Sequence, residues 1–184
     1  MAILKIARMG HPVLGRRAEP VSDPGSPGIR RLVADMIETM IDANGAGLAA
    51  PQVHVPLRVV IFQAPDERTD PALADAERFD HTAPLTVLVN PEFEVFGDET
   101  EAGWEGCLSV PGLRGLVERP AHIRYRGVDC DGEAIERTAR GFHARVVQHE
   151  LDHLDGILYP RRMKDLAQLI FESEARHWTR GSEQ

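Results

Sequence analysis

The sequence has few cysteines and no long hydrophobic run, and both shortages limit what the chain can be. Only Cys107 and Cys130 occur among its 184 residues, which is too few for a disulfide framework and leaves a thiol free for metal binding or catalysis. No stretch approaches the roughly 18 apolar residues of a membrane span, and residues 1–8 carry no apolar signal segment. We therefore expect a soluble, cytoplasmic protein without a membrane partner.

Positive charge is also in short supply. The chain has 21 Lys and Arg against 29 Asp and Glu, a net charge of −8, so it lacks the basic surface of a general nucleic-acid binder. A chain of this length can bury roughly 70% of its unfolded surface and needs no disulfides to fold. We expect residues 1–184 to form a single domain, with 164–184 as a C-terminal helix and tail.

The spacing of apolar and turn-forming residues predicts an α+β fold. A long helix is expected over residues 29–43, ended by Asn44-Gly45, and helices are expected again over 141–154 and 164–177. Strands are expected at 57–62, 85–90, 92–96, 122–128 and 133–138, with an Asp131-Gly132 hairpin turn. Residues 64–83 are polar and are expected to form a surface insertion. This order favours mixed or antiparallel sheets around a central helix, with N-terminal and C-terminal helices.

The strongest motif is Gln148-His149-Glu150-Leu151-Asp152-His153, an H-E-x-x-H pattern on a predicted helix. Residues four apart lie one turn apart on one face, so the two histidines can reach one metal ion. Glu150 lies about 60° around the helix from His153, where a general base is needed. For this pattern alone, an exposed helix with two chance histidines is the alternative.

The same helix is expected to be buried on two sides, with the active site in front and the core behind. Phe142 and Val146 share the face of the two histidines, with Arg145 at its edge. The opposite face is apolar and consists of Ala144, Val147, Leu151 and Leu154.

The motif also occurs in zincin peptidases, whose longer pattern adds a glycine and a third histidine. Gly156 stands at the glycine position, but Tyr159 stands where that histidine is required. Cys107, within Glu105-Gly106-Cys107-Leu108-Ser109, offers a third ligand instead. One cysteine and two histidines leave a fourth position for water, as in catalytic sites. This set suits Zn, Fe(II), Co(II) or Ni(II) without choosing among them.

A third motif, Gly45-Ala46-Gly47-Leu48-Ala49-Ala50-Pro51-Gln52, joins the first helix to a strand. One interpretation is a helix cap followed by small residues that pack closely. The functional interpretation is a loop whose glycines let the backbone approach a ligand, with the Gln52 amide donating to a developing oxyanion.

These three motifs together resemble the three signature motifs of peptide deformylases, which occur in the same order. All three are intact here: G-x-G-L-A-A-P-Q, E-G-C-L-S and Q-H-E-x-D-H. The resemblance extends to residues 3–13 and 110–114. It implies a hydrolase that removes the formyl group from the N-terminal formyl-methionine of newly synthesised polypeptides and releases formate. It also implies one divalent metal ion per chain, Fe(II) in cells and Zn, Ni or Co in purified protein.

The resemblance further implies a role for each matching residue. Cys107, His149 and His153 would bind the metal, and Glu150 would be the general acid and base. Gln52, the backbone N–H of Leu108 and Gly47 complete the catalytic group. The peptide would be bound by Ala46, Gly106, Arg114, Phe142 and Val146, the last two lining the methionine pocket.

Two other hypotheses stay open at this point. One is a zincin-like peptidase, against which Tyr159 argues. The other is a non-catalytic binding module, which predicts the loss of Glu150, Gln52 or a ligand. The 164–177 helix resembles the deformylase type that ends in a helix and in some members contacts the ribosome, although its basic residues are mixed with acids. Cys130 is expected to be a buried thiol on a strand, and Asp152 either bonds a metal-binding histidine or is exposed.

Overall fold

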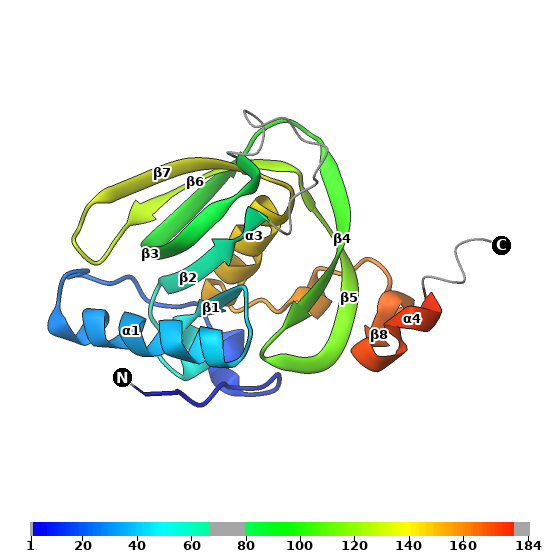
Figure 1. Ribbon diagram of the computed structural model, residues 1–184, viewed down its shortest axis with the longest axis horizontal. Helices are drawn as coiled ribbons and strands as arrows, with labels where there is room; N and C mark the ends of the chain where they lie inside the picture. Colours follow the sequence, from blue (N-terminus) through cyan, green and yellow to red (C-terminus); the bar gives the residue numbers. More distant parts are fainter. Residues whose placement is uncertain (1, 67–79, 179–184) are drawn as a thin grey trace.

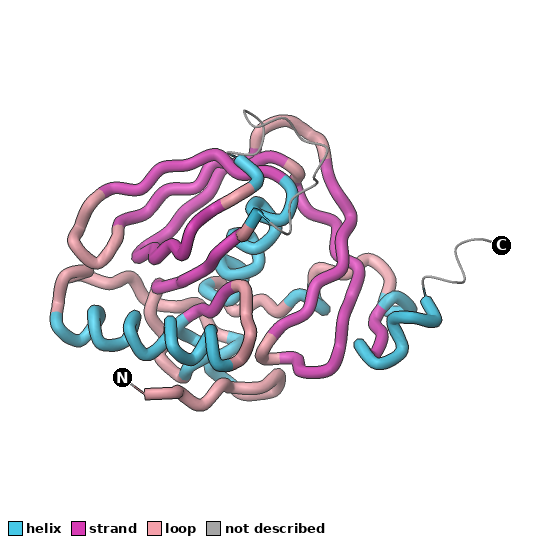
Figure 2. The backbone as a smooth tube through the Cα atoms, in the orientation of Figure 1, coloured by secondary structure: helices cyan, strands magenta, loops and turns pink. Residues whose placement is uncertain are grey.

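The computed structural model describes residues 2–66 and 80–178, so most of the predicted insertion at 64–83 lies outside the described residues. Figures 1 and 2 show antiparallel strands packed around helix α3. The strands are β1 (Gly47–Ala49), β2 (Val59–Ala64), β3 (Ala83–Val95), β4 (Thr100–Cys107), β5 (Val110–Pro120), β6 (His122–Val128), β7 (Ala134–Arg140) and β8 (Leu169–Phe171). The α-helices are α1 (Pro27–Asp42), α3 (Gly141–Leu154) and α4 (Ala175–Trp178).

The strands form a sheet of order β1-β2-β3-β6-β7 and a smaller sheet of order β4-β5-β8. All named strand pairs are antiparallel. Short 3-10 turns connect them at Pro12–Gly15, Ala50–Val53, Tyr159–Arg161, Leu166–Gln168 and Glu172–Glu174. The predicted α+β class, with antiparallel sheets around the motif-bearing helix, is confirmed. No helix in the described ranges is long and apolar enough to cross a membrane.

Strand β2 explains how the larger sheet is buried on both faces. Alternate residues of a strand point to opposite faces. Val60 and Phe62 pack in the cluster that contains the apolar face of α3, whereas Val59 and Ile61 pack in the cluster that contains α1. The sheet is therefore held between the two long helices, and α3 is fixed from behind by the core.

Helix α3 is buried from His143 to Leu154, as expected for a helix with a core face and a site face. Its predicted apolar face, Ala144, Val147, Leu151 and Leu154, lies in the core cluster. Gly156 follows with φ of 72° and ends the helix in the left-handed conformation that favours glycine. The predicted end of α1 is also confirmed, because Asn44 has φ of 53°.

Several local predictions are wrong in detail. The strands predicted at 85–90 and 92–96 form one strand, β3, with a register irregularity between Val89 and Glu92 and a left-handed Asn90. Such a bulge interrupts the apolar alternation without ending the strand. Cys130 lies in the turn after β6 and is only partly buried, because the Asp-Gly hairpin starts there.

The long helix predicted over residues 164–177 does not form. The chain instead makes a 3-10 turn, the short strand β8, a second turn and the four-residue helix α4. β8 pairs with β5 over Leu169–Phe171. A helix here would leave that edge of β5 unpaired, and tertiary pairing of this kind overrides the weak preference of a local sequence for helix.

Candidate metal centre and active-site cleft

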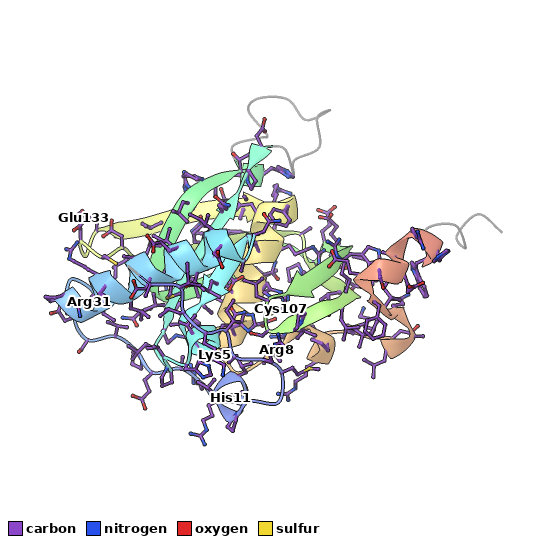
Figure 3. All side chains as sticks on the ribbon, turned by 60° about the horizontal axis from the view of Figure 1, so that its bottom comes forward. Lys5, Arg8, His11, Arg31, Cys107 and Glu133 are labelled. Carbon is purple, nitrogen blue, oxygen red and sulfur yellow. The ribbon has the colours of Figure 1, made fainter. Side chains whose placement is uncertain are left out.

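The three predicted metal ligands meet where the β4–β5 hairpin touches α3. Cys107 is the last residue of β4, and His149 and His153 lie one turn apart on α3. The Cys107 Sγ is 3.3 Å from His153 Nε2, and one ligand atom from each residue lies within 4.8 Å of the others. Metal–ligand bonds of about 2.0–2.3 Å fit ligand atoms this close together. Figure 3 labels Cys107 at this junction.

A carboxylate fixes the ring of His149. The Nδ1 of His149 lies 2.9 Å from Glu105 Oε2, two residues before Cys107 on β4. Burial alone would raise the pKa of Glu105, but hydrogen bonds from Arg119 and His149 outweigh it and hold that pKa well below its usual range. The ionised carboxylate only accepts, so Nδ1 carries a proton and Nε2 is the ring nitrogen left to bind a metal, which would displace any proton there.

His153 is ready for metal binding for a different reason. It is 1% exposed, and this burial, together with the nearby His149, lowers its pKa well below the ordinary value. The ring is therefore neutral, which is the state that binds a metal. Its Nδ1 is buried and finds no hydrogen-bond partner among the described residues.

Glu150 lies beside the three ligands, and one of its carboxylate oxygens has no hydrogen-bond partner among the described residues. The residue is 3% exposed, and this oxygen is Oε2. Burial raises its pKa to about 7, partly opposed by His149. A carboxyl group with this pKa can exchange protons near neutral pH. A Cβ at Gly47 would lie 2.6 Å from the Glu150 Cδ, so only glycine leaves room for this carboxylate.

Gln52 presents its amide to the candidate metal centre. Its Oε1 accepts from the Ala49 backbone N–H at 2.8 Å, which fixes the amide orientation. Its Nε2 then lies 3.6 Å from Cys107 Sγ and 3.1 Å from Ser109 Oγ. The donor group therefore faces the cluster of candidate metal ligands.

A cleft of about 510 Å³ joins these groups. It is lined by every predicted catalytic and peptide-binding residue, and by Cys107 and His149 of the candidate metal centre. The lining residues from the prediction are Ala46, Gly47, Gln52, Gly106, Leu108, Arg114, Phe142, Val146 and Glu150. His153 lies behind this lining, against Cys107. The structure thus brings together all the residues that the sequence motifs singled out.

The supporting charge network was not predicted. Arg119 donates to both oxygens of Glu105, at 2.6 and 2.9 Å, and to Asp152 at 2.8 Å. Arg145 also donates to Glu105, at 2.9 Å. Asp152 is 6% exposed and bonds Arg119 and Arg162, so neither expectation for it was right.

One signal in the sequence points to this network. Arg119 continues the buried alternation of Gly115 and Val117 on β5. A charged residue at an inward position of a strand needs a buried partner of opposite charge, and Glu105 is that partner.

Tyr159 occupies the position where a zincin would carry its third histidine. Its ring stacks on His149, with centroids 6.2 Å apart and planes 26° apart. The third ligand position of the cluster is filled by Cys107 instead. The zincin hypothesis therefore fails on geometry as well as on sequence.

Comparison with known proteins agrees with the motifs. Residues 3–169 match the family described as polypeptide deformylase. Peptide deformylase 1 of Bordetella pertussis is 56% identical over 161 residues, 88% of each chain, and that of Nitrosomonas europaea is 51% identical over 164 residues, 89% of each. The chain belongs to the polypeptide deformylase family. It is therefore a hydrolase that removes the formyl group from N-terminal formyl-methionine, and the hypothesis of a non-catalytic binding module is wrong.

Solved structures of the family have the same fold. A class I type b peptide deformylase from Acinetobacter baumannii matches with a TM-score of 0.76 at 40% identity, over 88% of this chain and all of that one. The peptide deformylase of Ehrlichia chaffeensis matches with a TM-score of 0.80 at 30% identity, over 99% of this chain and 97% of that one.

Proposed function

We propose that this protein deformylates newly synthesised polypeptides in the cytoplasm, at the cleft described above, and that residues 1–184 act as one catalytic domain. The observation that carries the proposal is the meeting of three ligand atoms within 4.8 Å, beside the buried carboxylate of Glu150, whose Oε2 has no hydrogen-bond partner in the part of the chain that the structure describes. A peptide substrate is supported by a relative, since a deformylase of Acinetobacter baumannii has been solved with Met-Ala-Ser bound.

The donor set fits one divalent ion. Cys107, His149 and His153 supply a thiolate and two imidazoles, and the Glu105 contact leaves His149 Nε2 available. We propose Fe(II) as the ion in cells, as the family resemblance implies, with Zn, Ni or Co able to replace it. When bound, such an ion supplies Lewis-acid polarisation and lowers the pKa of a water molecule from about 15.7 toward about 7.

Glu150 moves the protons of the reaction. We assign its Oε2 the proton of the attacking water, because that atom is buried and accepts no hydrogen bond from any residue that the structure describes. The same carboxyl group then delivers the proton to the departing amine as the formyl C–N bond breaks. The products are formate and a peptide with a free N-terminal methionine.

Gln52 and Leu108 stabilise the charge that develops on the formyl oxygen. The Gln52 Nε2 is aimed at the centre because its Oε1 is tied to Ala49. The backbone N–H of Leu108, the residue after Cys107, is the second donor. Donors of this kind contribute roughly 3–4 kcal/mol each to the transition state in well-measured cases.

The remaining cleft residues bind the peptide. Phe142 and Val146 line the cleft, two turns and one turn before His149 on α3, and receive the methionine side chain. Ala46 lies in the loop before β1, Gly47 on β1 and Gly106 on β4, where backbone groups can pair with an extended peptide. Arg114 lies opposite Gly106, beside the same peptide path.

The test is formate release from formyl-Met-Ala-Ser by protein loaded anaerobically with Fe(II) or Ni(II). We expect formate from this peptide and none after chelation of the metal. Cys107→Ala should lose both the ion and the activity, whereas Cys130→Ala, the matched control at the other cysteine, should keep both. No formate from the loaded parent, or a metal-replete and active Cys107→Ala variant, would count against the proposal.

Contact with the ribosome is a second proposal, restricted to the C-terminal segment. Its support is the positive charge of Lys164 and Arg176, both of which are exposed. We expect cosedimentation with ribosomes at low salt to weaken in an Arg176→Glu variant. Equal cosedimentation of parent and variant would remove the support.

A further inference from the structure

The C-terminal segment, residues 164–178, pairs with the edge of β5 and adds Glu172 to the lining of the active-site cleft, so we call it the cleft wall. β5 is the middle strand of its sheet: Arg114 pairs with Gly106 of β4 on one side and with Ile170 of β8 on the other. Figure 1 shows β8 and α4 in red beside β5. Arg114 is thus flanked by the residue next to Cys107 and by the C-terminal strand.

The cleft wall is anchored at both ends. At its start, Arg162 bonds the buried Asp152 at 2.6 Å, and Lys164 bonds Glu118 at 2.9 Å. At its end, the ring of Trp178 meets Trp104 edge-on, with centroids 6.0 Å apart. The residues between these anchors are therefore held at fixed positions relative to β5.

Glu172 is placed against Arg114 by this register. Ile170 lies directly opposite Arg114, and Glu172 begins the 3-10 turn that follows β8 two residues later, which brings its carboxylate beside Arg114. Arg114 Nη2 and Glu172 Oε1 form an ion pair of 2.6 Å, and both residues line the cleft. The two side chains are 48% and 56% exposed, so the pair sits at the mouth in contact with solvent.

An ion pair this exposed is easily exchanged. Coulomb attraction is weak in water, and fixing two long side chains costs entropy, so such pairs shift an equilibrium by only about twofold to fivefold. The carboxylate of an acidic peptide residue can form the same charge-assisted hydrogen bonds to the guanidinium. Glu172 and an acidic substrate therefore compete for one group.

We propose that Glu172 is a specificity-determining residue, which neutralises Arg114 and suppresses a preference for acidic residues after formyl-methionine. This inference rests on the proposed position of Arg114 beside the peptide. The family match ends at residue 169, so Glu172 lies outside it. An Arg114 whose charge is balanced by Glu172 suits an enzyme whose substrates differ in sequence after the N-terminal methionine.

The experiment compares two peptide amides that differ only in the third residue: formyl-Met-Ala-Asp and formyl-Met-Ala-Asn. The readout is the ratio of kcat/KM for the Asp peptide to that for the Asn peptide. In Glu172→Gln this ratio should rise about twofold to fivefold at low ionic strength, through KM. The rise should shrink in about 0.5 M salt, because exposed charges are screened.

Two further variants separate this role from a structural one. Glu174→Gln removes an equally exposed carboxylate that lies outside the cleft lining and should leave the ratio unchanged. In Arg114→Gln, adding Glu172→Gln should no longer raise the ratio. Three results would overturn this inference and leave the proposed function standing. They are an unchanged ratio in Glu172→Gln, an equal rise in Glu174→Gln, and a rise that persists in the Arg114→Gln background. No formate from the Asn peptide with the parent would overturn the proposed function as well.

Discussion

At the level of single residues, the space around Glu150 depends on Gly47. The Glu150 carboxylate occupies the volume that a side chain at position 47 would fill. Gly47→Ala should therefore displace Glu150 and lower kcat by about 100-fold or more, the scale of a misplaced acid–base group. The metal content should not change, because no ligand moves.

The control for this substitution is Gly28→Ala. A Cβ at Gly28 meets nothing within 4 Å, and the residue lies in the first turn of α1. Its activity should equal that of the parent. If Gly47→Ala were as active as Gly28→Ala, the assigned position of Glu150 would be wrong.

A second residue-scale prediction concerns His143 at the start of α3. Its Nδ1 donates to the Asp80 carbonyl, and its Nε2 accepts from the Tyr125 hydroxyl, so the folded ring is neutral. Burial lowers its pKa to about 4, against 6.5 for a free histidine. The unfolded chain therefore binds a proton first as the pH falls, and stability present above pH 6.5 is lost toward pH 4.

The size of this effect is about 3 kcal/mol across that range, at about 1.36 kcal/mol per pH unit. Urea unfolding between pH 7 and pH 4 should show it, and the His143→Gln variant should lose less stability over the same range than the parent. His177→Gln, at an exposed site, should behave like the parent. Parallel curves for the parent and His143→Gln would contradict the assignment.

At the level of elements, the contact between the β4–β5 hairpin and α3 depends on Arg119. This guanidinium lies between the carboxylates of Glu105 and Asp152, and all three groups are buried. Arg119→Leu would remove the cation that joins two buried carboxylates, leaving Arg145 beside Glu105 and Arg162 beside Asp152, and should cost about 3 kcal/mol of unfolding free energy, the lower end for a broken buried pair. Because Glu105 orients His149, metal should also dissociate faster into a chelator.

Arg126→Leu is the matched control for this network. Arg126 pairs with Glu92 on adjacent strands of the larger sheet, and both side chains are more than 60% exposed, at 67% and 68%. Its unfolding curve and metal release should match those of the parent. Equal effects of the two substitutions would show that the buried network has no special role.

The elements also show how much of the structure could be predicted from the sequence. The histidine motif predicted α3 correctly because its spacing has a helical period and both of its faces carry apolar residues. The C-terminal segment was predicted wrongly because its helical spacing reflects only neighbouring residues. The edge of β5 that pairs with Leu169–Phe171 is distant in the sequence and could not be seen from that spacing. The ion pairs of Arg119 were not predicted for the same reason. Its partners Glu105 and Asp152 lie 14 and 33 residues away from it in the sequence.

At the scale of the whole molecule, two layers meet at the reaction centre. The larger sheet and the core hold α3 with its histidines, and the smaller sheet supplies Cys107, Glu105 and Arg114. Ligands from both layers must come together before a metal can bind. Metal binding should therefore raise the thermal unfolding midpoint of the whole protein, since a ligand that binds only the folded state stabilises it. An equal midpoint with and without metal would contradict this.

The central claim is that Glu150 does the proton chemistry at a site that other residues build. The most direct measurement is formate release by Glu150→Gln, made together with its metal content. The account predicts one ion per chain and a loss of activity of about 1000-fold, within the range known for general acid–base groups. A metal-replete variant that keeps activity within about tenfold of the parent would contradict it, and so would a variant that cannot hold the ion.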